Sequence, residues 1–388
     1  MRKRSAFVTT LTAGLAIVAC QVVAGIEPVE KVDRVGTDGS VSDAPNGDPD
    51  AAVDPCNHAV PPPEPEKDDD RDTELPPFYL AFRTVDVIAK DANGYRGFDL
   101  DGVCTCDKRP GTAAEGKSSC TPKLKDCDGD AGIDNRGASL FEQFVPTGFS
   151  PGDSATKGVT SGRRGLLLYV KGYNGKPNDR QISVGVMLSH GIVDGSGCGT
   201  STGGQHSPPG WCGRDLWTYS LEYVKPTSKE PLVQGSGYVN NGTLVFRSDL
   251  PITMFFGTAT LSIGSPVTAG VLEKTAAGNW TLNAMLGGRI PVTELLEATG
   301  TFNAPNDPDP DARLCTSPLF TTVKKMLCEA VDINRTSALD FEDGACDAVS
   351  TTITFTAEQA MVGEERTEPA ENTACSKGNV TPDLYTCP

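Results

Sequence analysis

The stretch Ser-Gly-Tyr-Val-Asn-Asn-Gly-Thr-Leu-Val-Phe, residues 236–246, holds β-branched and aromatic residues on both sides of an Asn-Gly pair. This order predicts a strand, a tight turn and a second strand, because Asn and Gly tolerate the backbone angles of such a turn. Similar runs bounded by turn residues occur at 78–88, 166–173, 181–188, 216–224, 252–263, 267–272, 280–285 and 351–355. Regularly spaced strands with polar turns predict a mainly β fold, and we expect an elaborated β-sandwich.

Helical patterns are confined to the later part of the chain. Pro291–Ala298 begins with a Pro, which suits a first helical turn, and Pro318–Val331 places its apolar residues on one face. The order of strand, Asn-Gly turn, strand and Trp-containing loop resembles concanavalin-like and laminin-G-like proteins. This resemblance implies a sandwich of the jelly-roll type with a few short helices.

The composition excludes two classes of protein. The 388 residues include 42 Gly and 29 Pro, which argues against a coiled coil or another long-helix protein. Lys and Arg number 34 against 51 Asp and Glu, so the formal net charge is −17. Because phosphate-backbone binding requires Lys and Arg to displace counterions, we expect no nucleic-acid partner.

The N-terminus has the features of an export signal. Arg2–Arg4 precede an apolar run that ends at Cys20 and is too short to span a hydrocarbon core of about 30 Å. The sequence Ile-Val-Ala-Cys at 17–20 resembles the lipobox of bacterial lipoproteins. This resemblance implies that residues 1–19 are removed, that Cys20 is lipidated, and that the protein is anchored in a membrane. Gln21, where an Asp would favour inner-membrane retention, points to the outer membrane or cell surface. The alternative is an ordinary cleaved signal.

Residues 20–75 are expected to form a tether ahead of one domain at 76–388. Residues 21–75 contain 15 acidic and four basic residues, together with several Pro. Self-repelling charge and low hydrophobicity favour an extended, solvated spacer over a packed core. A cation-binding role for this charge run is the alternative.

Cysteine parity supports export. Removing the lipidated Cys20 from 13 Cys leaves 12, an even number, and an exported chain meets an oxidising environment. The disulfide candidates are Cys56, Cys104, Cys106, Cys120, Cys127, Cys198, Cys212, Cys315, Cys328, Cys346, Cys375 and Cys387.

Three groups of these cysteines are expected to pair locally. Cys198 and Cys212 would close a small loop, and Cys328 would join Cys315 or Cys346 and so hold the late helix to the body. The four cysteines at positions 104–127 fit two disulfides, or alternatively a four-thiolate zinc site. Export favours the disulfides.

An Asp-rich segment, from Asp99 and Asp101 to Gly137, is the candidate metal site. Its run 126–134 places Asp126, Asp128, Asp130 and Asp134 where a curled loop directs oxygens onto a hard cation such as Ca²⁺. The run resembles the loops of EF-hands and thrombospondin type 3 repeats, although Ala131 and Gly137 depart from the EF-hand pattern. The alternative is a disulfide-stapled loop whose Asp side chains cap turns.

The loop between Cys198 and Cys212 contains Gly-Thr-Ser-Thr-Gly at 199–203, which matches the G-x-S-x-G pattern of a nucleophile elbow. That motif requires a buried strand before the Ser and a helix after it. No helical pattern follows here, so Ser201 and His206 are an unsupported catalytic pair. We expect a small disulfide-closed loop instead.

Trp211, Trp217 and Tyr219 lie beside this loop and are the candidate ligand-binding residues. Aromatic rings next to a loop rich in short polar residues can stack on sugar rings, as in a lectin. The alternative is that these side chains belong to the core of the 216–224 strand.

No standard enzyme motif is present, because the sequence lacks H-E-x-x-H, a P-loop and the E-x-D-x-x-E run of concanavalin-like glycosidases. The sequence therefore favours a lipid-anchored envelope protein that binds an extracellular ligand, with a glycan or other surface polymer as the candidate partner. A hydrolase of surface polymers and a purely structural envelope protein are the alternatives, and whether the protein is an enzyme stays open.

Overall fold

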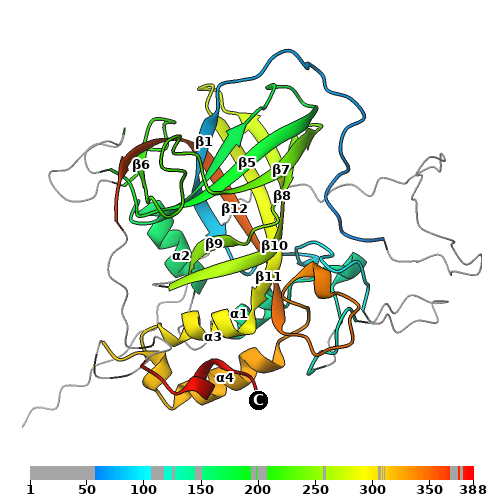
Figure 1. Cartoon of the computed structure of the whole chain (residues 1–388), viewed down its shortest axis with the longest axis vertical. Coiled ribbons are helices and arrows are strands. Elements are labelled where there is room, and N and C mark those ends of the chain that lie inside the picture. The colour runs from blue at the N-terminus through cyan, green and yellow to red at the C-terminus, as the bar shows by residue number, and fades with distance from the viewer. Residues whose placement is uncertain are drawn as a thin grey trace, which may run out of the picture. The chain divides into compact units, whose positions relative to one another are not determined.

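The computed structural model describes residues 57–105, 118–124, 127–144, 151–193, 198, 208–256, 259–304, 307, 309, 311–367, 375 and 379–388 (Figure 1). Among these residues, no helix combines the length and the apolar character needed to cross a membrane. The expected signal peptide and Cys20 lie outside the described residues.

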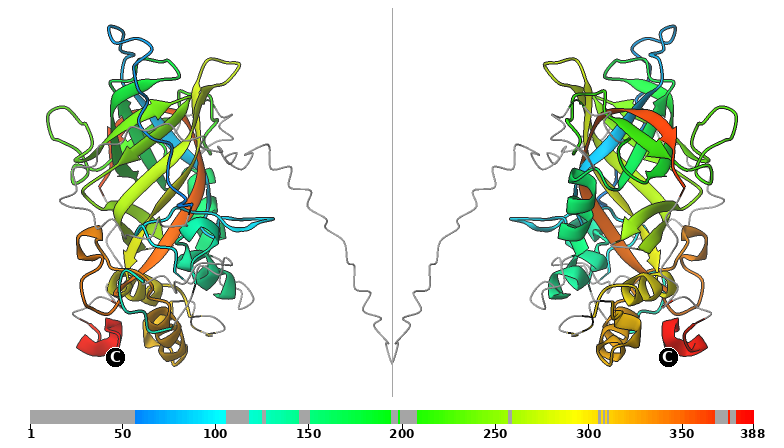
Figure 2. Two further views of the ribbon diagram at one scale, coloured as in Figure 1. Left: turned by 90° about the vertical axis from the view of Figure 1, so that its right-hand side faces the viewer. Right: turned by 90° about the vertical axis from the view of Figure 1, so that its left-hand side faces the viewer.

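The body is one antiparallel sheet that closes on itself into a barrel of eight strands (Figures 1 and 2). Each strand pairs with the next one along the chain, and the last pairs with the first. The strands are β1 (Phe78–Asp86), β4 (Gly165–Lys171), β5 (Asp179–Ser189), β7 (Val233–Asn240), β8 (Thr243–Arg247), β10 (Ala259–Lys274), β11 (Trp280–Pro291) and β12 (Ala348–Glu365).

Closure corrects the expected sandwich, whereas the mainly β fold is confirmed. The pairing that closes the barrel joins β1 to β12, with Thr84 opposite Thr356, 272 residues later. Local patterns of apolar residues and turns predict strands, but they carry no signal for a pairing across the whole domain. An eight-stranded barrel has an interior that side chains can fill. Here Leu80, Leu168 and Leu282 face inward and are at most 2% exposed.

Several strands are covered on their outer face as well. Leu167 of β4 and Met187 of β5 pack outside the barrel against Trp217 of β6 (Leu216–Tyr219), which runs parallel to the end of β12. Val245 of β8 packs outward against Phe98. Burial on both faces explains why residues 166–170 form a continuous apolar run and do not alternate with polar residues.

Smaller elements surround the barrel. Both expected late helices are confirmed, and they lie together at one end of the barrel in Figure 1. Two helices in Gly-containing segments were not expected from the sequence. The helices are α1 (Arg136–Phe144), α2 (Pro151–Thr160), α3 (Val292–Gly300) and α4 (Leu319–Glu329), with 3-10 turns at Asp130–Gly132, Leu314–Thr316, Ser337–Leu339 and Pro382–Tyr385. The minor strands are β2 (Lys90–Asp91), β3 (Gly94–Tyr95) and β9 (Ile252–Phe256), of which β9 pairs with β10.

Four disulfides join described residues: Cys120–Cys346, Cys198–Cys212, Cys315–Cys375 and Cys328–Cys387. The closed loop at 198–212 is confirmed. The expected pairing of Cys328 with Cys315 or Cys346 is wrong, because both bridges of the late helical region run to the C-terminal tail.

The four cysteines at 104–127 do not pair among themselves as two disulfides. Cys120 joins Cys346, 226 residues later, and Cys104 is also disulfide-bonded. Thiols held in disulfides cannot act as thiolate ligands, so the four-thiolate zinc alternative is excluded. Cys127 is exposed, and Cys56 and Cys106 lie outside the described residues.

Residues 57–75, which we call the strap, correct the expectation of a solvated tether over this part of the chain. The strap runs along the outside of the barrel before it enters β1, and it is the blue segment beside the barrel in Figure 1. Pro61 and Pro65 are buried, and hydrogen bonds join the strap to β5, to β7 and to the turn before β5. Most acidic side chains of the strap remain exposed, but hydrogen bonds hold the segment against the barrel.

Candidate functional site

A groove of about 720 Å³ lies between the strap and the outer face of β5, β7 and β8. We call it the strap groove. The strap wall is formed by Glu64, Asp68, Asp70, Arg71, Thr73 and Glu74. The barrel wall includes Gly172, Asn174, Asp179, Arg180, Gln181, Ser236, Tyr238, Val245 and Arg247. The lining is dominated by charged and polar groups.

One end of the strap is held by β7. The Tyr238 hydroxyl donates to the Pro62 carbonyl, and Asn240 Nδ2 donates to the Pro63 carbonyl over 2.8 Å. The strap has no backbone N–H at its Pro residues, and the carbonyls of Pro62 and Pro63 accept hydrogen bonds from side chains of β7. The adjacent Pro61 is buried. These contacts fix the height of the strap above β7.

The other end of the strap is held by its own acidic residues. Asp68 Oδ1 accepts the Arg180 backbone N–H over 2.7 Å, and Asp69 Oδ2 accepts the Asn178 N–H over 2.9 Å. The bond from Arg180 is the main cause that lowers the pKa of Asp68. Arg180 Nε also pairs with Glu64 at 2.6 Å. Charges that suggested a solvated spacer therefore bind the strap to the start of β5.

Asp179 closes the turn before β5. Its Oδ2 accepts the Asn174 N–H over 2.6 Å, and its Oδ1 accepts the Gln181 N–H over 3.1 Å. Burial raises the pKa of Asp179, and the two hydrogen bonds oppose this rise. Both oxygens have fixed backbone partners, so this carboxylate shapes the groove wall.

The strap groove also contains groups whose hydrogen-bonding capacity is unused. Arg247 is exposed on β8 and has no carboxylate partner among the described residues, whereas Arg71 and Arg180 are paired with strap carboxylates. Ser236 of β7 lies directly opposite Arg247 in the strand register and is also exposed. These two side chains face the groove together.

A second polar site, the aspartate cluster, consists of Asp99, Asp101, Asp128, Asp134 and Asp332. Oxygens of Asp99, Asp101 and Asp134 all lie within 4.8 Å of one another. Asp134 Oδ2 accepts the Leu100 N–H over 2.6 Å, and Asp128 Oδ2 accepts a backbone N–H over 2.7 Å. Convergent carboxylate oxygens are the ligands that a hard cation such as Ca²⁺ prefers.

Burial and mutual repulsion raise the pKa of four of the carboxyl groups in this cluster. Burial is the main cause that raises the pKa of Asp101, of Asp128 to about 7, and of Asp134 well above its usual range. The charges of neighbouring carboxylates raise these values further. Asp332, from the segment before β12, likewise has a pKa of about 7 because of burial. At neutral pH, either protonation or a bound cation would reduce the repulsion between these carboxylates and stabilise the cluster.

The expected metal loop is only partly reproduced. Asp128 and Asp134 belong to the cluster, Asp130 is exposed, and Asp126 lies outside the described residues. The carboxylates nearest to Asp134 come from the earlier segment 98–102, because Phe98 forms a β-bridge with Asp134. The Asp-rich composition indicated this earlier segment, whereas no local pattern could have indicated Asp332.

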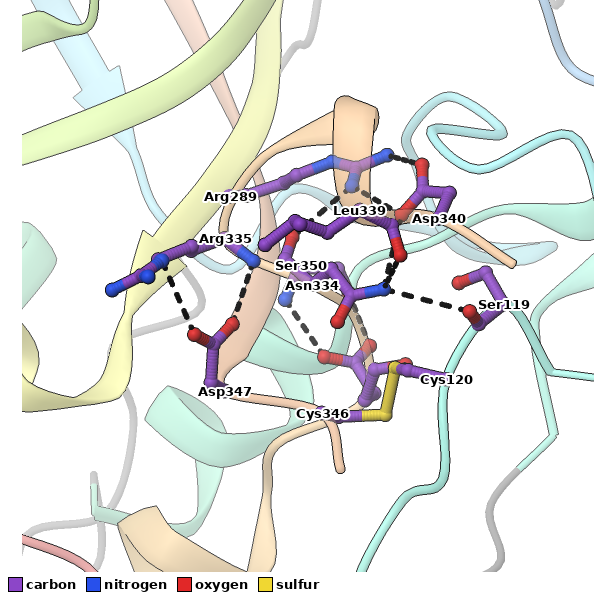
Figure 3. Close-up of a disulfide and its surroundings, with 11 residues drawn as sticks. Ser119, Cys120, Arg289, Asn334, Arg335, Leu339, Asp340, Cys346, Asp347 and Ser350 are labelled. Atoms are coloured by element: carbon purple, nitrogen blue, oxygen red, sulfur yellow. Dashed lines mark hydrogen bonds and ion pairs between the residues drawn. A yellow bond between two sulfur atoms is a disulfide. The ribbon is translucent and has the colours of Figure 1, made fainter. Parts of the chain in front are cut away.

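The buried ion pair of Arg289 and Asp340 is shown in Figure 3, and Arg289 also holds the segment that carries Asp99 and Asp101. Arg289 of β11 is 1% exposed and binds Asp340 through two hydrogen bonds of 2.6 and 2.7 Å. It also donates to the Leu100 carbonyl over 2.7 Å. The nearby disulfide Cys120–Cys346 joins the segment 118–124 to the loop before β12, which carries Asp340. Leu100 is thus held on one side by Asp134 and on the other by Arg289.

The expected aromatic binding face is corrected by burial. Trp217 is fully buried and Tyr219 is 4% exposed, so neither ring has a face that could stack on a sugar. Trp217 packs on Gly165, where a Cβ would come within 2.6 Å of the ring. Trp211 is half-buried, and Arg83 lies over its ring at 5.6 Å. The core alternative therefore describes these aromatic residues.

The G-x-S-x-G residues Ser201 and His206 lie outside the described residues. Comparisons of the chain with protein-family models, with curated proteins and with solved structures found no match.

Proposed function

We propose that this protein is an exported, lipid-anchored binding protein that holds a carbohydrate ligand in the strap groove. The observation that carries the proposal is the groove itself, about 720 Å³ in volume and lined by polar groups. This volume falls within the range of about 300–1,000 Å³ that is typical of ligand pockets. Another concavity of the described residues, near Leu124 and Met326, measures about 80 Å³.

The lining favours a ligand rich in hydroxyl groups. Sugars offer donors and acceptors in close succession, and they suit pockets of carboxylates, guanidinium groups, amides and hydroxyls. The strap groove supplies all four kinds, in Asp70, Arg247, Asn174 and Ser236. The barrel interior is filled by apolar side chains, so a ligand of this kind has its place outside the barrel.

Binding is favoured over hydrolysis by the roles of the groove carboxylates. A glycosidase needs two carboxylates free to act on the glycosidic bond. Of the five carboxylates that line the groove, four have other roles. Asp68 and Asp179 accept backbone N–H groups that hold the strap and the turn before β5. Asp70 accepts the Asp72 N–H, and Glu64 is paired with Arg180. Their fixed partners suit them to shaping a binding site.

Location at the outer membrane or cell surface rests on the lipobox at Cys20 and on the disulfides. Disulfides persist in oxidising compartments, and four of them join the described residues. Labelling of cells with an alkyne analogue of palmitate should mark the wild type and leave Cys20→Ser unmarked. Equal labelling of both proteins would contradict lipidation at this cysteine.

A glycan array probed with the full mature chain in detergent tests the binding proposal. Ser236→Trp should fill the groove floor and abolish the signal, since Ser236 is exposed and lines the groove. Val271→Trp is the matched control, because Val271 is 49% exposed on β10 and does not line the groove. Binding that survives Ser236→Trp, or an array without any signal for the wild type, would refute the proposal.

A further inference from the structure

The strap groove has one strongly uncompensated positive group, on its β8 wall. Arg180 is paired with Glu64, and Arg71 is paired with Asp68 at 2.9 Å. Among the described residues, no carboxylate pairs with Arg247. Its guanidinium therefore offers all of its N–H donors to solvent or to a ligand.

A second donor lies beside Arg247. Ser236 and Arg247 are directly opposite each other on β7 and β8, and cross-strand neighbours have Cβ atoms about 4.5–5.5 Å apart. Both side chains are exposed and line the groove. A planar guanidinium next to a hydroxyl is suited to a carboxylate, which accepts two parallel N–H bonds and a third bond from the O–H.

The Asp179 carboxylate lies away from this pair. Asp179 is opposite Val239, three residues along β7 from Ser236, or about 10 Å at 3.3 Å per residue. Coulombic repulsion between Asp179 and a ligand anion at Arg247 is weak over that distance in a water-filled groove. The free cation of the groove and the Asp179 carboxylate thus lie apart along β7.

We infer that the ligand is an acidic glycan of the uronic-acid type, whose carboxylate binds Arg247 and Ser236 and whose hydroxyl groups extend toward the Asp179 end. This inference rests on the proposed function and specifies the class of sugar. The ligand carboxylate sets the orientation of the chain in the groove, because Arg247 and Ser236 bind it at a distance from Asp179.

Calorimetric titration of the full mature chain with oligogalacturonate, and with its methyl ester of equal length, tests the inference. The acid should bind the wild type about tenfold more tightly than the neutral ester, as expected for charge-assisted hydrogen bonds. Arg247→Gln should remove this preference, and Arg247→Lys should retain part of it. Rising salt should weaken the binding of the acid to the wild type and have less effect on Arg247→Gln.

Arg335→Gln is the matched control, since Arg335 is exposed outside the groove and pairs with Asp347. It should keep the preference for the acid. Equal binding of acid and ester to the wild type, both blocked by Ser236→Trp, would overturn the inference and leave the proposed function standing. Failure of both probes, together with an array without signal, would overturn both.

Discussion

Asp332 contributes a carboxylate to the aspartate cluster, and its replacement by Asn tests whether burial raises the pKa of this group. Ser350 donates its backbone N–H to Asp332 Oδ1 over 2.8 Å and its hydroxyl to Oδ2 over 2.5 Å. Burial nevertheless raises the pKa of Asp332 to about 7, against these hydrogen bonds, which favour the charged form. Asp332→Asn keeps the shape and the acceptor for the Ser350 N–H, and it removes the charge.

The free energy of unfolding of the wild type should fall as the pH rises. A carboxyl group whose pKa is raised in the folded state stabilises the fold fully below its ordinary pKa of 3.8, and this contribution is lost as the pH rises through 7. The whole shift corresponds to about 4 kcal/mol, of which about 2.6 kcal/mol falls between pH 5 and pH 8. Because Asp332 is half-buried, water screens part of this effect, and we expect about 1–2 kcal/mol.

Guanidinium chloride unfolding with intact disulfides, at pH 5, 6, 7 and 8 and with a chelator present, measures this difference. Asp332→Asn should lose less stability than the wild type between pH 5 and pH 8. Asp347→Asn, at the exposed ion pair with Arg335, is the control and should follow the wild type. If Asp332→Asn and the wild type lose the same free energy over this range, the reasoning from burial is refuted.

Three further changes test the cation expectation, the buried ion pair and the C-terminal bridge. Ca²⁺ should bind the wild type with measurable heat and raise its melting temperature at pH 8, while Asp134→Asn should reduce both effects; titration of the wild type without heat would remove calcium as a candidate. Arg289→Met should lower the free energy of unfolding by about 3–5 kcal/mol because it leaves Asp340 buried without its partner, and Asp340→Leu in the same chain should restore part of the loss in denaturant unfolding. Replacing both Cys328 and Cys387 by Ser should lower the free energy of unfolding by about 4 kcal/mol, since the bridge closes a segment with a sequence separation of 59. Calorimetric melting without reductant measures this loss, and an unchanged melting temperature would contradict the presence of the bridge.

The hairpin at 236–246 shows what local sequence can predict. β7 and β8 flank Asn241 and Gly242, whose φ angles of 49° and 80° are in the left-handed region that the Asn-Gly pair favours. The closure of the barrel depends instead on the pairing of β1 with β12. The pattern of a strand predicts which residues share a face, but it does not predict which distant strand will pair with it to close the barrel.

The candidate sites show the same division between local and distant information. The spacing of Asp128 and Asp134 indicated an oxygen-rich site, and the partners Asp99 and Asp101 were visible as part of the same Asp-rich segment. Asp332 comes from almost 200 residues later, so only the fold could bring it near. The sequence did not reveal that Trp217 is buried, because composition does not distinguish an exposed ring beside a loop from a ring that a covering strand packs against the barrel.

The strap connects the two polar sites, and the number of its anchors decides how they can influence each other. At its start, Ala59 donates to the Ala131 carbonyl and accepts from the Asp99 N–H, next to the aspartate cluster. Further along, separate hydrogen bonds hold it to Tyr238 and to Arg180. Each such bond contributes about 0.5–1.5 kcal/mol, so losing the bonds at Ala59 leaves the strap attached over the groove by the others. A change of charge at the cluster should therefore loosen the entry of the strap first, and the groove should persist until the anchors on β5 and β7 are also broken.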